Sequence, residues 1–264
     1  MGFILSCSTI PTRINNLITI LHHTTNIRYK YFIVNLCVQY KRFGKFQIPK
    51  ELIHLCKSNK RIIFNIVDDM GPICKYVGAF LKIKQNLKHN KDDKIIIIDD
   101  DTLYHPDLFY ELMDAKTDDN ITTGSGFNYD ENRNYQIVEG KTEMVEGYGG
   151  ICFSVNQCDP FIMWFVKFYK HFNFTDDNVV SKYLQAAFLG DDFILSNNYP
   201  NKFAIKEGRK YIKPCQYGFN NDALHRNNVF GNNMESYKHL YDNIEVLETF
   251  KKKYKLNKEI NENL

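Results

Sequence analysis

Three consecutive aspartates, Asp99, Asp100 and Asp101, end an apolar run of four isoleucines. A run of β-branched residues without alternation predicts a strand that is buried on both faces. Carboxylates at its end repel one another unless a cation lies between them, and divalent cations prefer oxygen ligands. Because alternate residues of an extended segment face the same way, we expect Asp99 and Asp101 to bind one ion. Asp100 would then point away from the ion, to a ribose or to the backbone. The alternative to a metal site is a solvated acidic loop or a helix cap.

A second acidic pair, Asp191 and Asp192, follows Gly190 and precedes an apolar triplet. Acidic residues suit the first turn of a helix, where the backbone dipole is positive, so this pair is expected to begin one. The same carboxylates are also suited to general-base chemistry on a hydroxyl group. The two roles are compatible.

The aspartates need a fold that positions them. The sequence pattern of residues 1–115 predicts such a fold, because predicted strands alternate with predicted helices. Such alternation implies right-handed crossovers and a parallel sheet, in which ligands bind beyond the carboxyl ends of the strands. Neither the dinucleotide fingerprint G-x-G-x-x-G nor the phosphate loop G-x-x-x-x-G-K-[ST] occurs. Strands are predicted at 3–8, 31–38, 61–67 and 95–99, and helices at 13–23, from 49, at 72–89 and at 107–115.

The second half of the chain has a different pattern, with shorter strands and aromatic segments. No internal repeat and no linker rich in Pro, Gly or Ser separates the halves, so a single α/β domain is expected over 1–264. Strands are predicted at 122–127, 135–139 and within 145–155, and helices at 160–170, 177–188 and from Glu235.

The composition is that of a soluble globular chain, with 44% hydrophobic and 25% charged residues. A net charge of +3 is too balanced to indicate a nucleic-acid partner. The seven cysteines form no C-x-x-C pair, which favours reduced buried thiols over a zinc site or a disulfide framework. The absence of an apolar run of 18 residues and of a signal peptide predicts a cytoplasmic protein without a transmembrane segment. The excess of Lys, Asn and Ile suggests an AT-rich organism or a large DNA virus.

Five segments resemble, in order, one group of glycosyltransferases with the GT-A fold. The aspartate run looks like their D-x-D motif, and the resemblance covers about residues 3 to 200. Cys7 to Ile14 is similar to the group's T-I-P-S-R-I start, Asp69 to Lys75 to its D-x-G-P-x-x-K, Glu146 to Gly150 to its glycine-rich turn, and Gly190 to Ser196 to its late acidic pair.

The resemblance implies a Rossmann-like GT-A domain with a mixed, mostly parallel sheet flanked by helices. It implies Mn²⁺- or Mg²⁺-dependent transfer of a sugar from a nucleotide sugar, in particular a UDP-sugar, to a hydroxyl of a glycan or glycoprotein acceptor. Residues 1–115 would bind the nucleotide sugar, 116–234 would bind the acceptor and catalyse, and 235–264 would form a C-terminal helix and tail. A homodimer is compatible with this arrangement.

The resemblance also assigns roles to single residues on the donor side. Asp101 would coordinate the metal, Asp99 the metal or a ribose, and Asp100 would belong to the donor site. His225 is either a further metal ligand or a structural histidine. Thr9, Pro11 and Arg13 would border the nucleoside, Asp69 would accept hydrogen bonds from base or ribose, and Lys75 would contact phosphate.

Several alternatives stay open. Arg13 is equally expected as a surface cation at a helix start, and the basic run 206–210 either clamps a diphosphate or is solvated. On the acceptor side, the resemblance makes Asp192 the base and Asp191 the residue that orients the acceptor.

Three other function classes fit the sequence less well. A haloacid-dehalogenase-type phosphatase prefers Thr or Val at the position of Leu103. A nucleotidyltransferase normally carries a glycine-rich loop after its first strand, which is absent here. A non-catalytic nucleotide-sugar binder would have no need of Asp99, Asp101 and Asp192.

Overall fold

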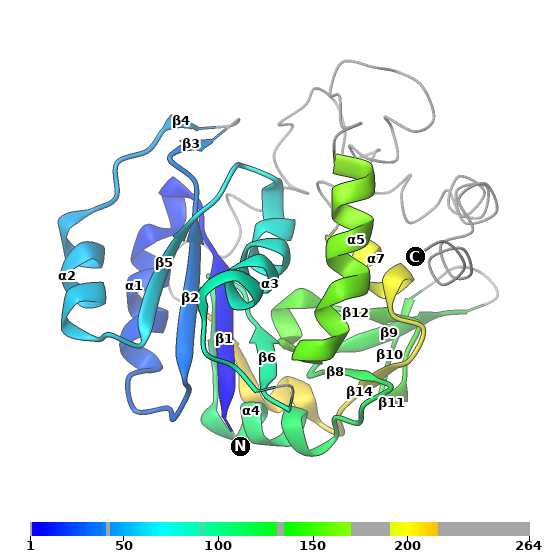
Figure 1. The fold of residues 1–264 in the computed structure, drawn as a ribbon. Helices are drawn as coiled ribbons and strands as arrows, with labels where there is room; N and C mark the ends of the chain where they lie inside the picture. The colour runs from blue at the N-terminus through cyan, green and yellow to red at the C-terminus, as the bar shows by residue number, and fades with distance from the viewer. Residues whose placement is uncertain (1, 41–42, 91, 131–134, 170–190, 216–264) are drawn as a thin grey trace.

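The computed structural model describes residues 2–40, 43–90, 92–130, 135–169 and 191–215, and these are built around one eight-stranded sheet (Figure 1). The strand order is β11-β14-β8-β13-β6-β1-β2-β5. Four neighbouring strands are parallel, namely β5 (Ile62–Ile66), β2 (Tyr31–Leu36), β1 (Phe3–Ser8) and β6 (Lys94–Ile97). This confirms the expected α/β class with a mixed, mostly parallel sheet between helices.

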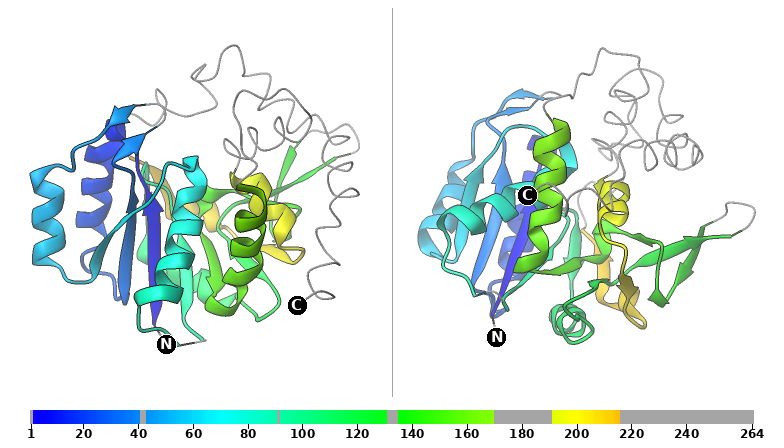
Figure 2. Two further views of the ribbon diagram at one scale, coloured as in Figure 1. Left: turned by 45° about the horizontal axis from the view of Figure 1, so that its top comes forward. Right: turned by 45° about the vertical axis from the view of Figure 1, so that its right-hand side comes forward.

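The other half of the sheet is mixed. Strand β13 (Ile151–Ser154) runs antiparallel to β6 and to β8 (Ile121–Thr123). Strand β14 (Lys202–Ala204) runs parallel to β8, and β11 (Gly140–Lys141) closes this edge antiparallel to β14. A small sheet of β10 (Tyr135–Val138), β9 (Gly126–Tyr129) and β12 (Met144–Val145) lies beside it (Figure 2).

Helices cover both faces of the sheet, and Figures 1 and 2 show α3 (Cys74–Asn86) and α5 (Cys158–Tyr169) on one of them. Ile95 and Ile97 pack with these helices and with α7 (Asp191–Asn198). Ile96 and Ile98 pack on the opposite side with α1 (Ile14–His23), α2 (Lys50–Ser58) and α4 (Pro106–Asp114). Every isoleucine of the central run is therefore buried, which explains the unbroken apolar pattern.

Single turns of 3-10 helix connect several of these elements. They are η1 (Pro11–Arg13), η2 (Gly71–Ile73), η3 (Gly147–Gly149), η4 (Val155–Gln157) and η5 (Gly208–Tyr211). The hairpin β3 (Gln39–Tyr40) and β4 (Gly44–Lys45) follows β2. No helix within the described residues is long and apolar enough to cross a membrane.

Several predicted strands end earlier than expected, and for two of them the structure shows the reason. The strand predicted at 95–99 ends at Ile97, because the Asp99 amide donates to the Tyr104 hydroxyl (2.9 Å) and the chain turns at Asp100. It continues into β7 (Thr102–Tyr104), which pairs with β15 (Ile212–Pro214). The strand predicted at 122–127 is broken at Gly124, where the backbone of Gly149 approaches so closely that a methyl group would lie 2.6 Å from its oxygen.

The predicted helices at 177–188 and from Glu235 lie outside the described residues, as do Gly190 and His225. The assignment of 1–115 and 116–234 to donor and acceptor stays a prediction.

A buried polar network fixes α3 on the sheet. The Ser6 hydroxyl donates to the Lys75 carbonyl (2.7 Å), and the Asn35 amide donates to the Ser6 hydroxyl (2.9 Å). The Asn65 amide donates to the Asn35 side-chain oxygen (2.8 Å) and to the Gly78 carbonyl (3.0 Å). Strands β1 and β5 thus hydrogen-bond to the first turns of α3, and Asn35 on β2 supports Ser6 and Asn65, which sets the position of Lys75.

Gly78→Ala is expected to destabilise the protein although alanine normally favours a helix by about 1 kcal/mol. The new methyl group would lie 2.2 Å from Asn35 Oδ1 and would break the buried network. We expect a net loss of about 1–3 kcal/mol in the free energy of urea unfolding. In an Asn35→Ala background the same substitution should cost at least about 1 kcal/mol less. Equal costs in both backgrounds would contradict this account.

Candidate functional site

The acidic and basic residues singled out above meet at one edge of the sheet. The parallel strands β1, β2, β5 and β6 end there, and the antiparallel strand β13 begins there. The edge therefore gathers the segment after β1, the aspartates after β6 and the glycine-rich turn before β13. Asp191, at the first turn of α7, contacts this edge through Lys75.

Arg13 binds two of the three consecutive aspartates. Its Nη1 lies 3.1 Å from Asp100 Oδ1 and 3.0 Å from Asp101 Oδ2. The Thr9 hydroxyl donates to the other Asp100 oxygen at 2.6 Å. The Arg13 side chain is 15% exposed, and its Nε is buried without a hydrogen-bond partner among the described residues. Arg13 is thus part of the site and not a solvated cation at a helix start, and Pro11 begins the 3-10 turn that carries it.

Lys75 joins the third aspartate to the second acidic pair. Its Nζ lies 2.5 Å from Asp99 Oδ1 and 2.9 Å from Asp191 Oδ2. Lys75 is 5% exposed and Asp191 7%. Burial lowers the pKa of Lys75, but Asp191 and Asp99 outweigh it and hold the pKa well above its usual value, so the ammonium is charged.

Asp192 lies beside this ion pair and is held by backbone. The Gly147 amide donates to Asp192 Oδ1 at 2.9 Å. A methyl group on Gly147 would lie 2.7 Å from Lys75 Nζ and 2.8 Å from Asp192 Oδ1, so any larger residue there would displace these two charged groups. Burial and the neighbouring Asp191 raise the pKa of Asp192 well above its usual value. Tyr76, whose buried hydroxyl has no hydrogen-bond partner among the described residues, also faces this position.

The arrangement of the aspartate run differs from the expectation of a shared ligand pair. Asp100 and Asp101 share Arg13, whereas Asp99 turns to Lys75. The alternation rule does not apply, because these residues form a turn and not a continuation of β6. Which of them bind a metal stays a prediction.

The site has the charge and the type of donor atom that suit a divalent cation, although no three of its described carboxylates bring their oxygens within 4.8 Å of one another. Five carboxylates, those of Asp99, Asp100, Asp101, Asp191 and Asp192, surround the two cations Arg13 and Lys75. Burial, followed by Asp100 and Asp99, raises the pKa of Asp101 to about 7 against the opposing effect of Arg13. Such an excess of clustered carboxylate oxygens is the donor set that Mg²⁺ and Mn²⁺ prefer.

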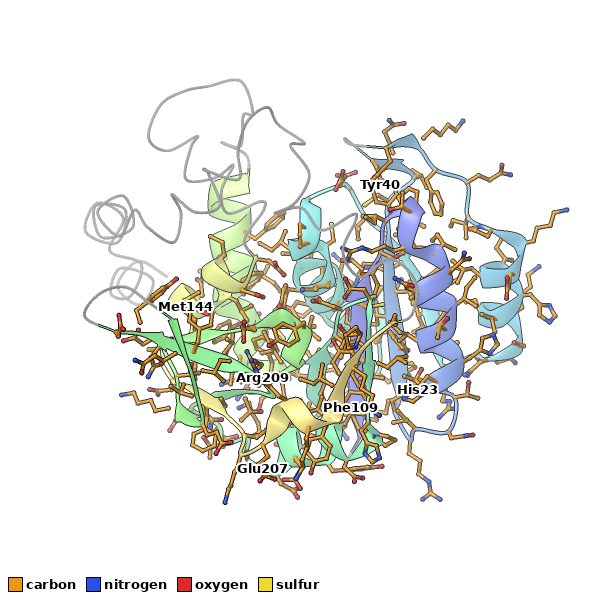
Figure 3. The ribbon with its side chains drawn as sticks, turned by 180° about the vertical axis from the view of Figure 1, so that it is seen from behind. His23, Tyr40, Phe109, Met144, Glu207 and Arg209 are labelled. Atoms are coloured by element: carbon orange, nitrogen blue, oxygen red, sulfur yellow. The ribbon has the colours of Figure 1, made fainter. Side chains whose placement is uncertain are left out.

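A second polar cluster, not found by sequence reasoning, lies next to the aspartates. Arg209 on η5 donates to Ser125 Oγ (2.8 Å) and to Glu146 Oε2 (2.8 Å), and its guanidinium lies 5.7 Å from the centre of the Tyr148 ring. Figure 3 shows Arg209 from the back of the molecule. In the sequence, Arg209 belongs to the basic run 206–210. The structure pairs it with Glu146, and a role of this run in clamping a diphosphate stays a prediction.

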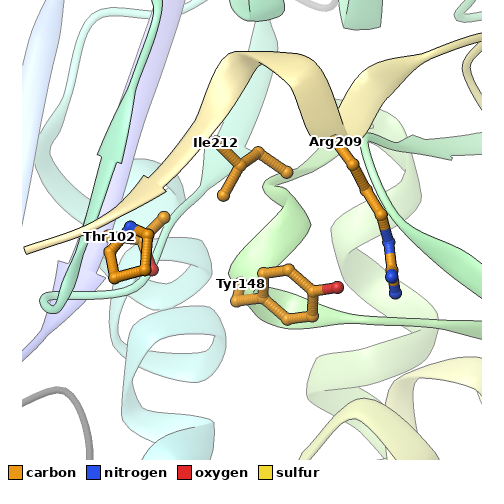
Figure 4. A pocket seen from close by; sticks show the side chains of 5 residues that line it. Thr102, Tyr148, Arg209 and Ile212 are labelled. Carbon is orange, nitrogen blue, oxygen red and sulfur yellow. The ribbon is translucent and has the colours of Figure 1, made fainter.

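This cluster borders a pocket of about 130 Å³. One of the residues that line the pocket is Thr102, which follows Asp101 in the sequence. Figure 4 shows the labelled side chains around it. The lining residues are Thr102, Tyr148, Arg209, Ile212 and Pro214.

Asp69 lies farther along the same edge, after β5. Its Oδ1 accepts a hydrogen bond from the Gly71 amide (3.0 Å), and the side chain is partly exposed.

Comparisons with known proteins leave the function open. No protein-family model matches the chain, and no curated protein matches it by sequence. Among solved structures, the inositol-1-phosphate CTP transferase from T. maritima is similar over 77% of this chain and 84% of its own, with 9% identity and a TM-score of 0.41. The 2-C-methyl-D-erythritol 4-phosphate cytidylyltransferase of Francisella tularensis is similar over 63% and 77%, with 10% identity and a TM-score of 0.38. Similarities this weak do not support a functional argument.

The raised pKa of Asp101 predicts that metal-free protein loses stability as the pH rises. Folded Asp101 keeps its proton up to about pH 7, whereas the unfolded carboxyl releases it near 3.8. Between these values the folded state binds more protons, so the free energy of unfolding should fall by up to about 4 kcal/mol. Urea unfolding in the presence of a chelator, from about pH 4 to about pH 8, measures this fall.

Asp101→Asn should flatten that pH dependence and exceed the wild type in stability at about pH 8. The exposed Asp107→Asn is the matched control and should leave the profile unchanged. An Asp101→Asn profile as steep as that of the wild type would assign the pH dependence to the other carboxylates.

Proposed function

We propose that the protein is a metal-dependent glycosyltransferase that moves a sugar from a nucleotide sugar, in particular a UDP-sugar, to a hydroxyl of a glycan or protein-linked acceptor. The observation that carries the proposal is the excess of five carboxylates over two cations at the carboxyl edge of a parallel sheet. The ordered resemblance of five sequence segments to GT-A glycosyltransferases supports it.

Asp101 and Asp99 would hold the Mn²⁺ or Mg²⁺. When bound, the ion neutralises the negative charge that builds on the departing diphosphate. Such cations usually keep waters and take substrate phosphate oxygens as their other ligands, so two protein carboxylates suffice. The identity of the ion rests on this donor chemistry alone.

Arg13 and Lys75 then become available to the donor. Both cations are bound to carboxylates in the ligand-free protein. With those carboxylates partly neutralised by a bound divalent cation, the guanidinium and the ammonium would be able to bind the anionic diphosphate. Thr9 and Pro11 would border the nucleoside, and Asp69 would accept hydrogen bonds from base or ribose.

Asp192 is the proposed general base. Its pKa is raised well above the usual range, mainly by burial, which makes its carboxylate a stronger proton acceptor than an exposed aspartate. If the reaction inverts the anomeric centre, Asp192 accepts the proton of the acceptor hydroxyl as that oxygen bonds to the anomeric carbon. The bond from this carbon to the diphosphate oxygen breaks, and the electron pair leaves with the diphosphate. Asp191, bound to Lys75, would orient the acceptor.

Product analysis separates this proposal from the other classes. Transfer of a sugar releases a nucleoside diphosphate, whereas nucleotidyl transfer to a sugar phosphate releases pyrophosphate. We therefore suggest a panel of nucleotide sugars with and without Mn²⁺, followed first by thermal shift and then by product detection. If UDP stabilises the protein but no nucleotide sugar of the panel gives a product, a non-catalytic binder is favoured.

Asp101→Ala is expected to weaken Mn²⁺-dependent binding of UDP by at least about tenfold, or 1.4 kcal/mol. The substitution removes one carboxylate that would hold the ion. Isothermal titration with UDP in Mn²⁺ and in chelator measures the effect. Asp107→Ala, an exposed aspartate on α4, is the control and should bind as the wild type does. Unchanged Mn²⁺-dependent affinity of the Asp101→Ala protein would remove Asp101 from the metal site.

Asp192→Asn is expected to keep UDP affinity within about twofold while transfer falls by about 10²–10⁴. The amide preserves the shape of the side chain and the acceptor for the Gly147 amide, but it cannot take a proton. Steady-state rates with saturating donor, together with donor affinity, measure the two effects separately. Full activity of this variant would contradict the assignment of Asp192 as the base and would not affect the proposed metal site.

A further inference from the structure

Two buried cysteines and an aspartate converge at the carboxyl ends of β2 and β5. Cys37 follows β2, Asp69 follows β5, and Cys74 is the first residue of α3. The two sulfur atoms and a carboxylate oxygen of Asp69 all lie within 4.8 Å of one another. Both thiols are buried, at 4% and 2% exposure, and Asp69 is partly exposed.

Backbone amides hold the side chains of Asp69 and Cys74, and a tyrosine holds the backbone of Cys37. The Gly71 amide donates to Asp69 Oδ1 at 3.0 Å, and the Met70 amide donates to Cys74 Sγ at 3.3 Å. The hydroxyl of Tyr40 accepts from the Cys37 amide (3.2 Å) and donates to the Thr9 carbonyl (2.8 Å). Outer hydrogen bonds of this kind hold first ligands in place at metal sites.

We propose that Cys37, Asp69 and Cys74 form a binding site for one zinc ion, separate from the carboxylate site at Asp99–Asp101. Two thiolates and one carboxylate are a common type of zinc ligand set, and a water can complete the tetrahedron. Zinc–sulfur bonds of about 2.3 Å place two sulfurs about 3.8 Å apart, so the ligands need to close by about 1 Å at most. Thiolates are soft ligands, which disfavour Mg²⁺ and Mn²⁺.

The Cys74 thiol is protonated before a metal binds. A hydrogen bond between Cys74 and Cys37, together with burial, raises the pKa of Cys74 well above its usual value. Zinc must therefore displace the Cys74 thiol proton as it binds. This site shares Asp69 with the proposed nucleotide site, but its two thiols take no part in the proposed sugar transfer, and its test uses no nucleotide.

The test is titration of the reduced, metal-free full-length protein with Co²⁺ and then with Zn²⁺. We expect one equivalent of Co²⁺ to give thiolate-to-cobalt charge-transfer absorption, which Zn²⁺ abolishes and excess Mn²⁺ leaves unchanged. One equivalent of Zn²⁺ should also raise the melting temperature. Asp69→Asn should weaken Co²⁺ binding by at least about tenfold, at the low end of ligand effects.

Cys37→Ala and Cys74→Ala should each lose the charge-transfer absorption. Cys152→Ala removes a buried thiol outside the cluster and should keep it, as should Asp101→Ala. Circular dichroism checks that each variant folds, and Cys→Ser versions replace any alanine variant that does not.

Two results would overturn the zinc site. One is the absence of thiolate-to-cobalt absorption in the reduced wild type; a Cys37–Cys74 disulfide formed under air in such a protein would then explain the proximity as a redox pair. The other is absorption that persists in both cysteine variants.

Discussion

The ion pairs of Lys75 are the interaction on which the rest of the site depends. One ammonium, 5% exposed, connects Asp99 after the central strand with Asp191 at the start of α7, two segments far apart in the sequence. Burying a charge is tolerated only where opposite charges surround it. The hydrogen bonds between the sheet and α3 fix the position of Lys75 along that helix. Because Gly147 has no side chain, there is room for the Lys75 ammonium. A buried cation thus organises a site that has surplus negative charge.

The fold could be predicted wherever the determining pattern was local. The isoleucines from Ile95 to Ile98 pack alternately on two helical layers, so a run without polar residues had one plausible structure. Pairing between distant segments left no such signal. Strands β7 and β15 pair although more than a hundred residues separate them in the sequence, and no local pattern near Thr102 or Pro214 predicts this pairing. The turn at Asp100 is fixed by the Asp99 amide and the Tyr104 hydroxyl of β7, which no local pattern indicated, and the predicted strand was therefore too long.

The candidate site divides in the same way. The segment from Thr9 to Arg13 was singled out by its resemblance to the T-I-P-S-R-I start, and Thr9 and Arg13 do contact Asp100. Its partners followed only from the three-dimensional arrangement. The expectation that cysteines without a C-x-x-C spacing are ordinary core thiols rested on sequence distance, whereas the fold brings Cys37 and Cys74 together from two strand ends. His225, outside the described residues, remains a prediction.

Because Lys75 is buried, its reactivity toward chemical reagents reports on local opening of the structure around it. Reagents that acylate amines react with the neutral, accessible form, and this ammonium is both covered and held charged by its neighbours. Covalent footprinting followed by peptide mass mapping should therefore leave Lys75 unmodified while the exposed Lys210 is labelled. Any acylation of Lys75 would register the moments at which α3 and α7 separate, without a substrate and without a mutation.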